Sequence, residues 1–522
     1  MSKKPNVIFI YADDLGRGLL SCYGQKYFKT PNIDALCHQG LNFTNAHGCH
    51  ICAPARASLL CGIHDSHCGG WFFTKAGIYV DYAKGELTLP EVYELIHNTG
   101  IEKRSESEFL PMLFNKAGYM TGQIGKLEWG FATTGDELDK HGWQYHYGYY
   151  DHQQCHGYFP PFMFENGKRV DIPGNTNPDC GKFSFPSEGE ITPERLAGLG
   201  CAAYNQDLFD GKILDFLRAN KDRPFFLYHP STLPHGVLSV TALDPQVKDD
   251  DRLTFKEKVY ASMVLRLDAT VGMITRELEA LGIADNTMIV FSADNGHAFY
   301  YGSRGDGNFP GTNLEQRKVN HLDVRYDSVS AGDIFDGNNG MSGCKTTNLE
   351  GGNRVPLMIK WPGVTAPGTT SRALVANYDF YATVADLFGF PLAPTKDGVS
   401  YLPLLEGRQQ DFEEHEFVVF AGDNGPAIIG RDGFKLRTHI HDKNLKFQLF
   451  GDHWDSLERQ TVFELYDLNN DYTESDNIID KYPERARELT KMLMRECDGN
   501  LMHGTTRPHY VFYNYNYEKK KT

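Results

Sequence analysis

The sequence predicts an α/β fold with a large, mainly parallel central sheet flanked by helices, followed by a smaller C-terminal α+β domain with an antiparallel sheet. Three observations lead to this prediction. Short apolar runs typical of buried strands alternate with stretches of helical period along the first 400 residues. Two of these runs end in acidic residues, as strands often do at a ligand-binding edge. Beyond residue 400 the pattern changes to short strand-like pieces and one helix.

The strands expected in the first domain are apolar runs bounded by polar or turn residues. They cover residues 6–12, 119–125, 223–231, 286–296 and 354–363. Helices are expected where apolar residues recur every three or four positions. These stretches cover residues 30–40, 54–61, 202–220 and 252–281. Because strands and helices alternate, we expect most of the sheet to be parallel.

The last part of the chain has a different pattern of apolar and polar residues. Strand-like pieces cover residues 416–422, 433–439 and 462–468, and a helical stretch follows at 483–497. We therefore expect two domains, residues 1–400 and 401–522, and a frayed tail after residue 513.

Composition limits the partners of the protein. Its 522 residues have a formal net charge of −16, which argues against nucleic-acid binding, although a local positive pocket could still hold an anion. No apolar run approaches the roughly 18 residues of a membrane span. The apolar run at 7–12 is too short for a signal peptide, and eleven irregularly spaced cysteines fit reduced thiols. We expect a cytoplasmic protein, or a secreted or periplasmic one if a signal has been removed.

Acidic residues follow two of the expected strands. Asp13 and Asp14 end the first, and Asp294 and Asn295 end another. Such strand ends converge in an open α/β sheet. Three carboxylates and an amide oxygen suit Ca²⁺ or Mg²⁺ better than zinc. Either pair alone could instead cap a helix or form a turn.

Cys52 lies at the start of an expected helix, with Pro54 and Arg56 close behind it. The unpaired N–H groups and the positive dipole end of the helix would stabilise a nearby anion. The same surroundings could activate a thiolate for ordinary nucleophilic chemistry.

The pattern Cys-x-Pro-x-Arg at Cys52, Pro54 and Arg56 resembles the signature of the formylglycine-dependent sulfatases. Seven further segments resemble that family in the same order, and the similarity spans roughly residues 5–485. These segments are residues 6–16, 30–40, 122–130, 224–238, 290–297, 343–363 and 463–477. The resemblance implies the fold of the alkaline-phosphatase superfamily.

The resemblance also implies a mechanism. A separate maturation enzyme oxidises Cys52 to formylglycine, and the aldehyde hydrate presents two hydroxyl groups. One hydroxyl attacks sulfur, and the other lets the sulfated intermediate collapse. One divalent cation, normally Ca²⁺, is expected on the hydrate at Cys52 and on the residues that match the family's ligands. These residues are Asp13, Asp14, Asp294 and Asn295.

Basic residues at matching positions would act on the sulfate and on the leaving group. Lys126, Lys345 and Arg56 would surround the developing negative charge, and His235 would protonate the leaving alkoxide. The expected substrate is a small sulfate monoester, most plausibly of a saccharide, attacked by an exo-acting sugar O-sulfatase.

Three positions depart from the family pattern, and the first is Ala55, where serine is commoner. Glu128 stands where a histidine is expected after the lysine, and it would either act as the base that frees sulfate or pair with Lys126. His297 follows Asn295-Gly296 directly, and it would either contact the leaving group or cap the turn.

Two segments are candidates for substrate recognition. The aromatic and histidine-rich residues 145–168 suit a sugar ring, although core packing is the favoured interpretation for most of them. The loop 297–342 follows a strand end and is the stronger candidate. Its candidate contacts are Arg304 and, more loosely, Arg317, His321 and Arg325.

Two alternatives compete with a sulfatase. The first is a phosphomonoester or phosphonate-ester hydrolase on the same scaffold, but two-zinc relatives would need more histidines near Asp294 than His297 alone. The second is a sulfoglycan-binding protein that has lost turnover, which Glu128 favours and the retained Cys52 opposes.

Overall fold

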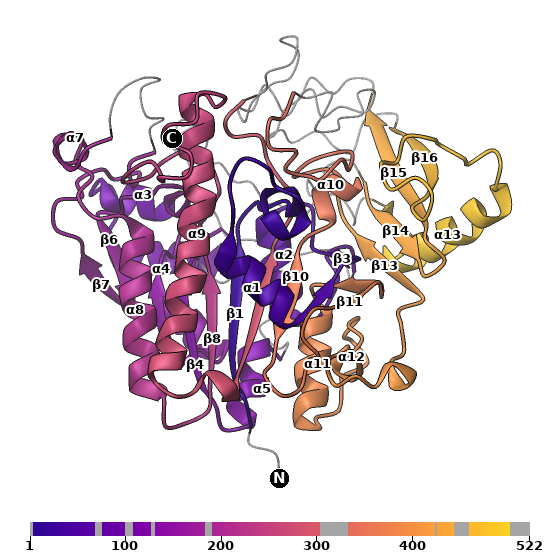
Figure 1. Cartoon of the computed structure of the whole chain (residues 1–522), viewed down its shortest axis with the longest axis horizontal. Helices are drawn as coiled ribbons and strands as arrows, with labels where there is room; N and C mark the ends of the chain where they lie inside the picture. The colour runs from indigo at the N-terminus through magenta and orange to yellow at the C-terminus, as the bar shows by residue number, and fades with distance from the viewer. Residues whose placement is uncertain are drawn as a thin grey trace.

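The structure is a computed structural model of the chain (Figure 1). It describes residues 4–67, 76–99, 108–126, 131–182, 191–302, 332–422, 425–442 and 459–501. Its two main β-sheets are separate and have ten and four strands. Two sheets were expected from the change in the apolar pattern near residue 400.

The ten-stranded sheet has the order β11-β2-β10-β9-β1-β8-β4-β5-β6-β7. Its middle strands are parallel, which confirms the predicted fold class. The strands are β1 (Asn6–Ala12), β2 (Leu41–Phe43), β4 (Met120–Gly125), β5 (Tyr145–Gly148), β6 (Phe162–Glu165), β7 (Lys168–Asp171), β8 (Phe225–Pro230), β9 (Thr287–Ala293), β10 (Leu357–Lys360) and β11 (Thr369–Ser371). A short pair, β3 (Ala46–His47) and β12 (Val375–Ala376), lies beside it.

Helices cover both faces of this sheet, and β1 shows why. Ile8 and Ile10 point into one apolar cluster, whereas Val7 and Phe9 point into the other. A strand that is buried on both faces is apolar throughout. The first cluster includes α1 (Pro31–Gln39), α8 (Asn205–Asn220) and α9 (Phe255–Ala280). The second includes α2 (Cys52–Cys61), α4 (Leu89–Thr99), α5 (Leu110–Lys116) and α11 (Asp379–Phe388).

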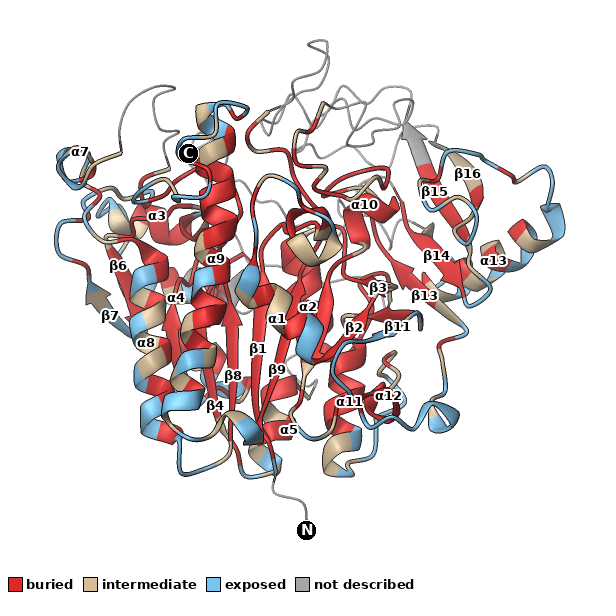
Figure 2. Cartoon of the chain, viewed as in Figure 1, coloured by how far each residue is buried: buried red, intermediate tan, exposed pale blue. Residues whose placement is uncertain are grey.

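Short helices complete this part of the molecule. They are α3 (Ile78–Ala83), α6 (Gly135–Lys140), α7 (Pro193–Gly198), α10 (Glu350–Asn353) and α12 (Leu402–Leu405). Figure 2 shows the sheet buried beneath its helices, while the outer faces of α8 and α9 are partly exposed.

Two features of the sheet differ from the sequence-based expectation. The segment 145–168, for which no strand was expected, supplies β5, β6 and the first residue of β7. Strands β6 and β7 extend the sheet with antiparallel pairs. Strand β10, expected among parallel strands, runs antiparallel to both of its neighbours. Local apolar pattern does not encode strand direction, because the connection and the packing decide it.

The four-stranded sheet is antiparallel, with the order β13-β14-β15-β16. Its strands are β13 (Phe417–Phe420), β14 (Ala427–Gly430), β15 (Phe434–Asp442) and β16 (Arg459–Asp467). Helix α13 (Pro483–Glu496) packs Leu489 and Leu493 against it. Within the described residues, no helix is both long and apolar enough to span a membrane.

Candidate active site

The carboxyl ends of four adjacent strands meet in one buried cluster of charged side chains. Strand order β9-β1-β8-β4 makes the loops after them neighbours, as is general for ligand sites in open α/β sheets. Asp13 and Asp14 follow β1, Asp294 and Asn295 follow β9, His235 lies beyond β8, and Lys126 follows β4. The structure therefore brings together residues that are up to 282 positions apart, from Asp13 to Asn295.

The acidic part of the cluster is held rigidly by its own hydrogen bonds. Asp14 N–H and Asn295 N–H both donate to Asp294 Oδ1, at 3.0 and 2.9 Å. The Asn295 side-chain amide donates to Asp14 Oδ1 at 2.8 Å. Asp13, Asp14, Asp294 and Asn295 are all fully buried.

Two oxygens of this cluster accept no hydrogen bond from the described residues. Asp13 Oδ1 and Asn295 Oδ1 are buried and have no hydrogen-bond partner among the described residues. A buried polar atom without a partner is costly unless a ligand satisfies it. Carboxylate oxygens of Asp13 and Asp294 also lie within 4.8 Å of each other and of Cys52 Sγ. These residues fit a hard divalent cation, the chemistry expected from the sequence.

Each carboxylate of the cluster also accepts a hydrogen bond from a basic side chain. Lys126 Nζ donates to Asp13 Oδ2 at 2.6 Å, and Lys345 Nζ donates to Asp14 Oδ2 at 2.8 Å. Arg56 Nη2 donates to Asp294 Oδ2 at 2.9 Å. The three basic groups expected around a sulfate therefore lie in one buried site.

These pairings set the charges of the carboxyl groups. Burial raises the pKa of Asp13, but Lys126, His235 and Arg56 together hold it well below its usual value. Burial, followed by the negative charge of Asp13, raises the pKa of Asp294 to about 7. A cation between the two would favour the ionised form of both.

Cys52 is the first residue of α2, and its side chain is 1% exposed. Every residue of this helix is buried, and Arg56 lies one turn further on, above the ring of Tyr11. Burial raises the pKa of the Cys52 thiol despite the opposing charges of Lys126 and Lys345. The surroundings therefore do not favour a thiolate, which counts against ordinary cysteine nucleophilic chemistry.

Comparison with known proteins identifies the family. The model of the sulfatase family matches residues 5–390, and that of the N-sulphoglucosamine sulphohydrolase C-terminal region matches residues 345–500. The chain belongs to the sulfatase family. It is a sulfuric ester hydrolase, as the resemblance in the sequence implied.

Relatives of this sulfatase include proteins of similar length. An N-acetylgalactosamine-6-O-sulfatase of Bacteroides thetaiotaomicron is 27% identical over 94% of this chain and 93% of its own. Human arylsulfatase A is 31% identical over 78% of this chain and 69% of its own.

Solved structures share the fold of the sulfatase. Ps i-CgsB in complex with k-i-k-neocarrahexaose has a TM-score of 0.67 at 21% identity and covers 100% of this chain and 98% of its own. BT4656 in complex with its substrate D-glucosamine-2-N,6-O-disulfate has a TM-score of 0.60 at 19% identity, over 95% of this chain and 99% of its own.

His235 and Lys345 form a close pair in the sulfatase. Lys345 Nζ lies 3.0 Å from His235 Nε2, and His235 Nδ1 bonds to the Gly236 carbonyl. Burial and the charge of Lys345 lower the pKa of His235 to about 3. In this arrangement the ring is neutral, Nε2 accepts, and Lys345 holds the proton of the pair.

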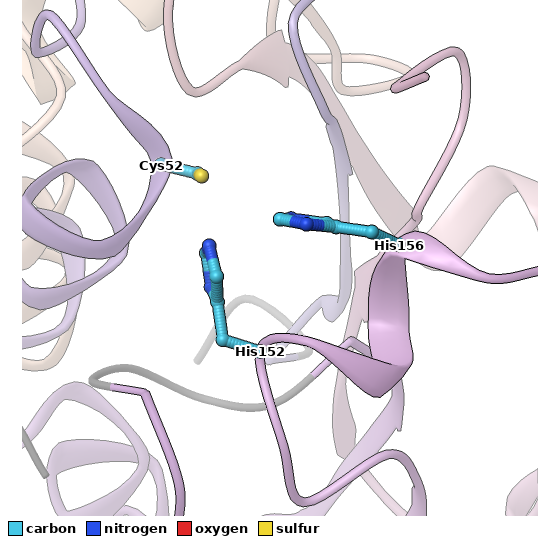
Figure 3. A group of neighbouring side chains, drawn as sticks. All are labelled: Cys52, His152 and His156. Atoms are coloured by element: carbon cyan, nitrogen blue, oxygen red, sulfur yellow. The ribbon is translucent and has the colours of Figure 1, made fainter. Parts of the chain in front are cut away.

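Three site residues were not predicted individually from the sequence. Tyr300 donates a short hydrogen bond to Asp14 Oδ2 and lies 3.4 Å from Lys345 Nζ. His152 and His156, in the loop after β5, place ring nitrogens within 4.8 Å of Cys52 Sγ (Figure 3). The histidine content of residues 145–168 was the available signal. Core packing remains the correct interpretation for three tyrosines of this segment, which are buried in the first apolar cluster: Tyr147, Tyr149 and Tyr158.

Other predicted residues lie elsewhere. His297 is buried away from the cluster, and its ring nitrogens contact Tyr260 Oη at 3.0 Å and Tyr301 Oη at 2.8 Å. These contacts favour a structural role over contact with a leaving group. Glu128, Arg304, Arg317, His321 and Arg325 lie outside the described residues.

Proposed function

We propose that this sulfatase removes sulfate from a small sulfated saccharide, as an exo-acting sugar O-sulfatase. It would do so through a formylglycine made from Cys52 by a maturation enzyme, with one divalent cation, Ca²⁺ or alternatively Mg²⁺. The observation behind this proposal is that Cys52 Sγ lies within 4.8 Å of carboxylate oxygens of Asp13 and Asp294, in a cluster that also holds Lys126 and Lys345.

Relatives support the saccharide substrate. N-acetylgalactosamine-6-O-sulfatase is named for a sulfated sugar, and two solved structures of the same fold hold a carrageenan oligosaccharide and a glucosamine disulfate. Arylsulfatase A, also similar, is named for an aryl ester. The saccharide is favoured because three of these four proteins act on or bind sugars.

The chain's own residues would divide the work as follows. Asp13, Asp14, Asp294 and Asn295 would hold the cation, which supplies positive charge that polarises a sulfate oxygen. The formylglycine hydrate would supply the attacking hydroxyl and the second hydroxyl needed for release.

Lys126 and Lys345 would hold the negative charge of the sulfate, because both ammonium groups are buried and fixed by carboxylates. Arg56 would position Asp294 through their 2.9 Å bond. The proton for the leaving oxygen would come from the Lys345–His235 pair, whose shared proton lies at Lys345 Nζ.

The test combines mass and turnover. Co-expression with a formylglycine-generating enzyme should lower the mass of the Cys52 peptide by about 18 Da and produce hydrolysis of sulfated N-acetylhexosamines. Cys52→Ala should reduce turnover by at least about 10⁴-fold, and Cys37→Ala, a buried cysteine of α1, should change neither result.

Two outcomes would overturn the proposal. Full turnover by Cys52→Ala would exclude the formylglycine. Faster hydrolysis of the matching phosphate monoesters than of the sulfates would favour the phosphohydrolase alternative.

A further inference from the structure

Three metal-binding side chains from two distant parts of the chain meet beside the acidic cluster. Cys52 begins α2, and His152 and His156 lie four residues apart after β5. One ligand atom of each lies within 4.8 Å of the other two. Figure 3 shows the sulfur and both rings facing a common space.

One nitrogen of this cluster has no partner within the described part of the chain. His156 Nε2 is buried and has no hydrogen-bond partner among the described residues. The His156 ring is held in place by stacking on His235, with centroids 3.9 Å apart, and the His152 ring meets it edge-on at 4.4 Å. Burial lowers the pKa of both rings well below the usual value, so both are neutral ligands.

A second histidine cluster in the described residues differs, because its ring nitrogens have protein partners. His67 Nδ1 contacts Asp397 Oδ1 at 2.8 Å, and His64 Nδ1 accepts from Ser66 N–H at 3.3 Å. Those donors already have protein partners. The cluster at Cys52 differs because His156 Nε2 has no such partner among the residues that the structure describes.

The donor set selects the kind of metal. One sulfur and two imidazole nitrogens suit Zn²⁺, whereas Ca²⁺ takes oxygen ligands. Zinc bonds of about 2.3 Å to sulfur and about 2.1 Å to nitrogen separate tetrahedral ligands by about 3.6 Å. The three atoms lie within 4.8 Å of one another, so a bound zinc ion would draw them together by up to about 1.2 Å.

We propose that the unoxidised sulfatase binds one Zn²⁺ ion through Cys52 Sγ, His152 and His156, with a water molecule as fourth ligand. The sulfur–zinc bond forms as the thiol releases its proton to solvent, and both histidines bind as neutral rings. The site exists only while position 52 is a cysteine. This limit on the zinc site rests on the proposed function, because the formylglycine expected from Cys52 contains no sulfur.

Zinc binding would use the sulfur that oxidation of Cys52 removes. The same side chain would belong to a soft metal site before oxidation and to a hard cation site after it. The nearby carboxylates of Asp13 and Asp294 are the competing ligands, since they also lie within 4.8 Å of Cys52 Sγ.

Cobalt titration tests the site directly. Metal-free protein with an intact Cys52 thiol, verified by peptide mass, is titrated with Co²⁺. We expect one equivalent to produce thiolate-to-cobalt absorption in the near ultraviolet and the visible bands of a tetrahedral ion, and Zn²⁺ to displace both. Because the titration measures metal binding to unoxidised protein and not turnover, its result is independent of whether the proposed sulfatase activity is found.

Variants identify the ligands. Cys52→Ser should remove the thiolate band, and His152→Ala and His156→Ala should each weaken Co²⁺ binding at least about 10-fold. His67→Ala controls for the second histidine cluster, and Asp294→Asn controls for the competing carboxylates. Both controls should retain the thiolate band, and His67→Ala should bind Co²⁺ within a few-fold of the parent. Circular dichroism of each variant verifies folding.

Alkylation gives a second measurement that does not depend on cobalt. Zn²⁺ should slow the reaction of iodoacetamide with the Cys52 peptide at least about 10-fold, and Ca²⁺ should not. The proposal is wrong if no thiolate band forms, or if the band survives both histidine substitutions. It is also wrong if Asp294→Asn removes the band while His152→Ala leaves it.

Discussion

Single residues decide the charge balance of the active site. Three buried carboxylates each accept a hydrogen bond from a basic side chain, so Lys126, Lys345 and Arg56 offset the charges of Asp13, Asp14 and Asp294. Removing one partner of a buried pair leaves an uncompensated charge, which is costly. Any change here should therefore alter both the geometry of the cation ligands and the affinity for sulfate.

Tyr300 gives a prediction at this scale. Tyr300→Phe should lower kcat/KM for a sulfated sugar about 10- to 100-fold, because Asp14 loses a hydrogen bond to a charged acceptor and Lys345 loses a neighbour. Steady-state kinetics of the matured enzyme measures the effect.

Tyr301→Phe is the matched control. Its hydroxyl contacts His297 and Asp333 rather than the cluster, so this variant should lose stability but retain kcat. Unchanged kcat/KM in Tyr300→Phe would show that the tyrosine hydroxyl plays no part in the site.

At the scale of elements, helix α1 is fixed by a side chain from another helix. Thr30, the residue before α1, makes no capping hydrogen bond with its side chain. Asp268 of α9 takes this role instead, because its Oδ1 accepts from Asn32 N–H at 3.0 Å and from Ile33 N–H at 2.8 Å. A carboxylate at a helix N-terminus also meets the positive end of the helix dipole.

Asp268→Ala should therefore lower the free energy of unfolding by about 1–2 kcal/mol, the usual value of a helix cap. Denaturant unfolding followed by circular dichroism measures it. Asp249→Ala, at an exposed position before α9, should change little. Equal stabilities for the two variants would contradict the cap.

At the scale of the whole molecule, a buried ionic network joins the two sheets. Lys435 of β15 contacts Glu350 of α10 at 3.0 Å and Glu474 at 2.8 Å, with all three side chains fully buried. Glu350 also contacts His47 and Arg354, next to the central sheet. Burial raises the pKa of Glu350, but Lys435, Arg354 and His47 hold it well below its usual value.

Lys435→Met should destabilise the protein by about 3–5 kcal/mol, because two buried carboxylates lose their shared cation. Thermal unfolding should show the loss. Arg487→Met removes an exposed ion pair within α13 and should shift the midpoint very little. A Lys435 variant as stable as its parent would show that the network does not hold the sheets together.

Cation binding should also be visible in global stability. Ca²⁺ at 100 times its dissociation constant should add about 2.7 kcal/mol, since the ion satisfies Asp13 Oδ1 and Asn295 Oδ1, which otherwise lack partners among the described residues. Differential scanning fluorimetry with and without a chelator measures the shift. Asp294→Asn should abolish the calcium dependence, and a shift that survives this substitution would place the ion elsewhere.

Much of the fold and part of the site could be predicted from the sequence. Apolar runs mark strands that are buried on both faces, so β1, β4, β8 and β9 were found. Asp13, Asp14, Asp294 and Asn295 were found because polar residues at strand ends interrupt the apolar pattern. Lys126, His235 and Lys345 depended on the resemblance to a family, since a single lysine or histidine has no distinctive local pattern.

The sequence by itself determined the two-part architecture and the set of chemical groups available at the carboxyl edge of the sheet. Only the tertiary structure decided that Tyr300 contacts Asp14, that His152 and His156 face Cys52, and that His297 is held by tyrosines instead. It also decided the direction of β10 and the extension of the sheet through β5 to β7. The physical reason is that apolar periodicity is a local property of the chain, whereas these contacts depend on how loops far apart in sequence pack over one sheet.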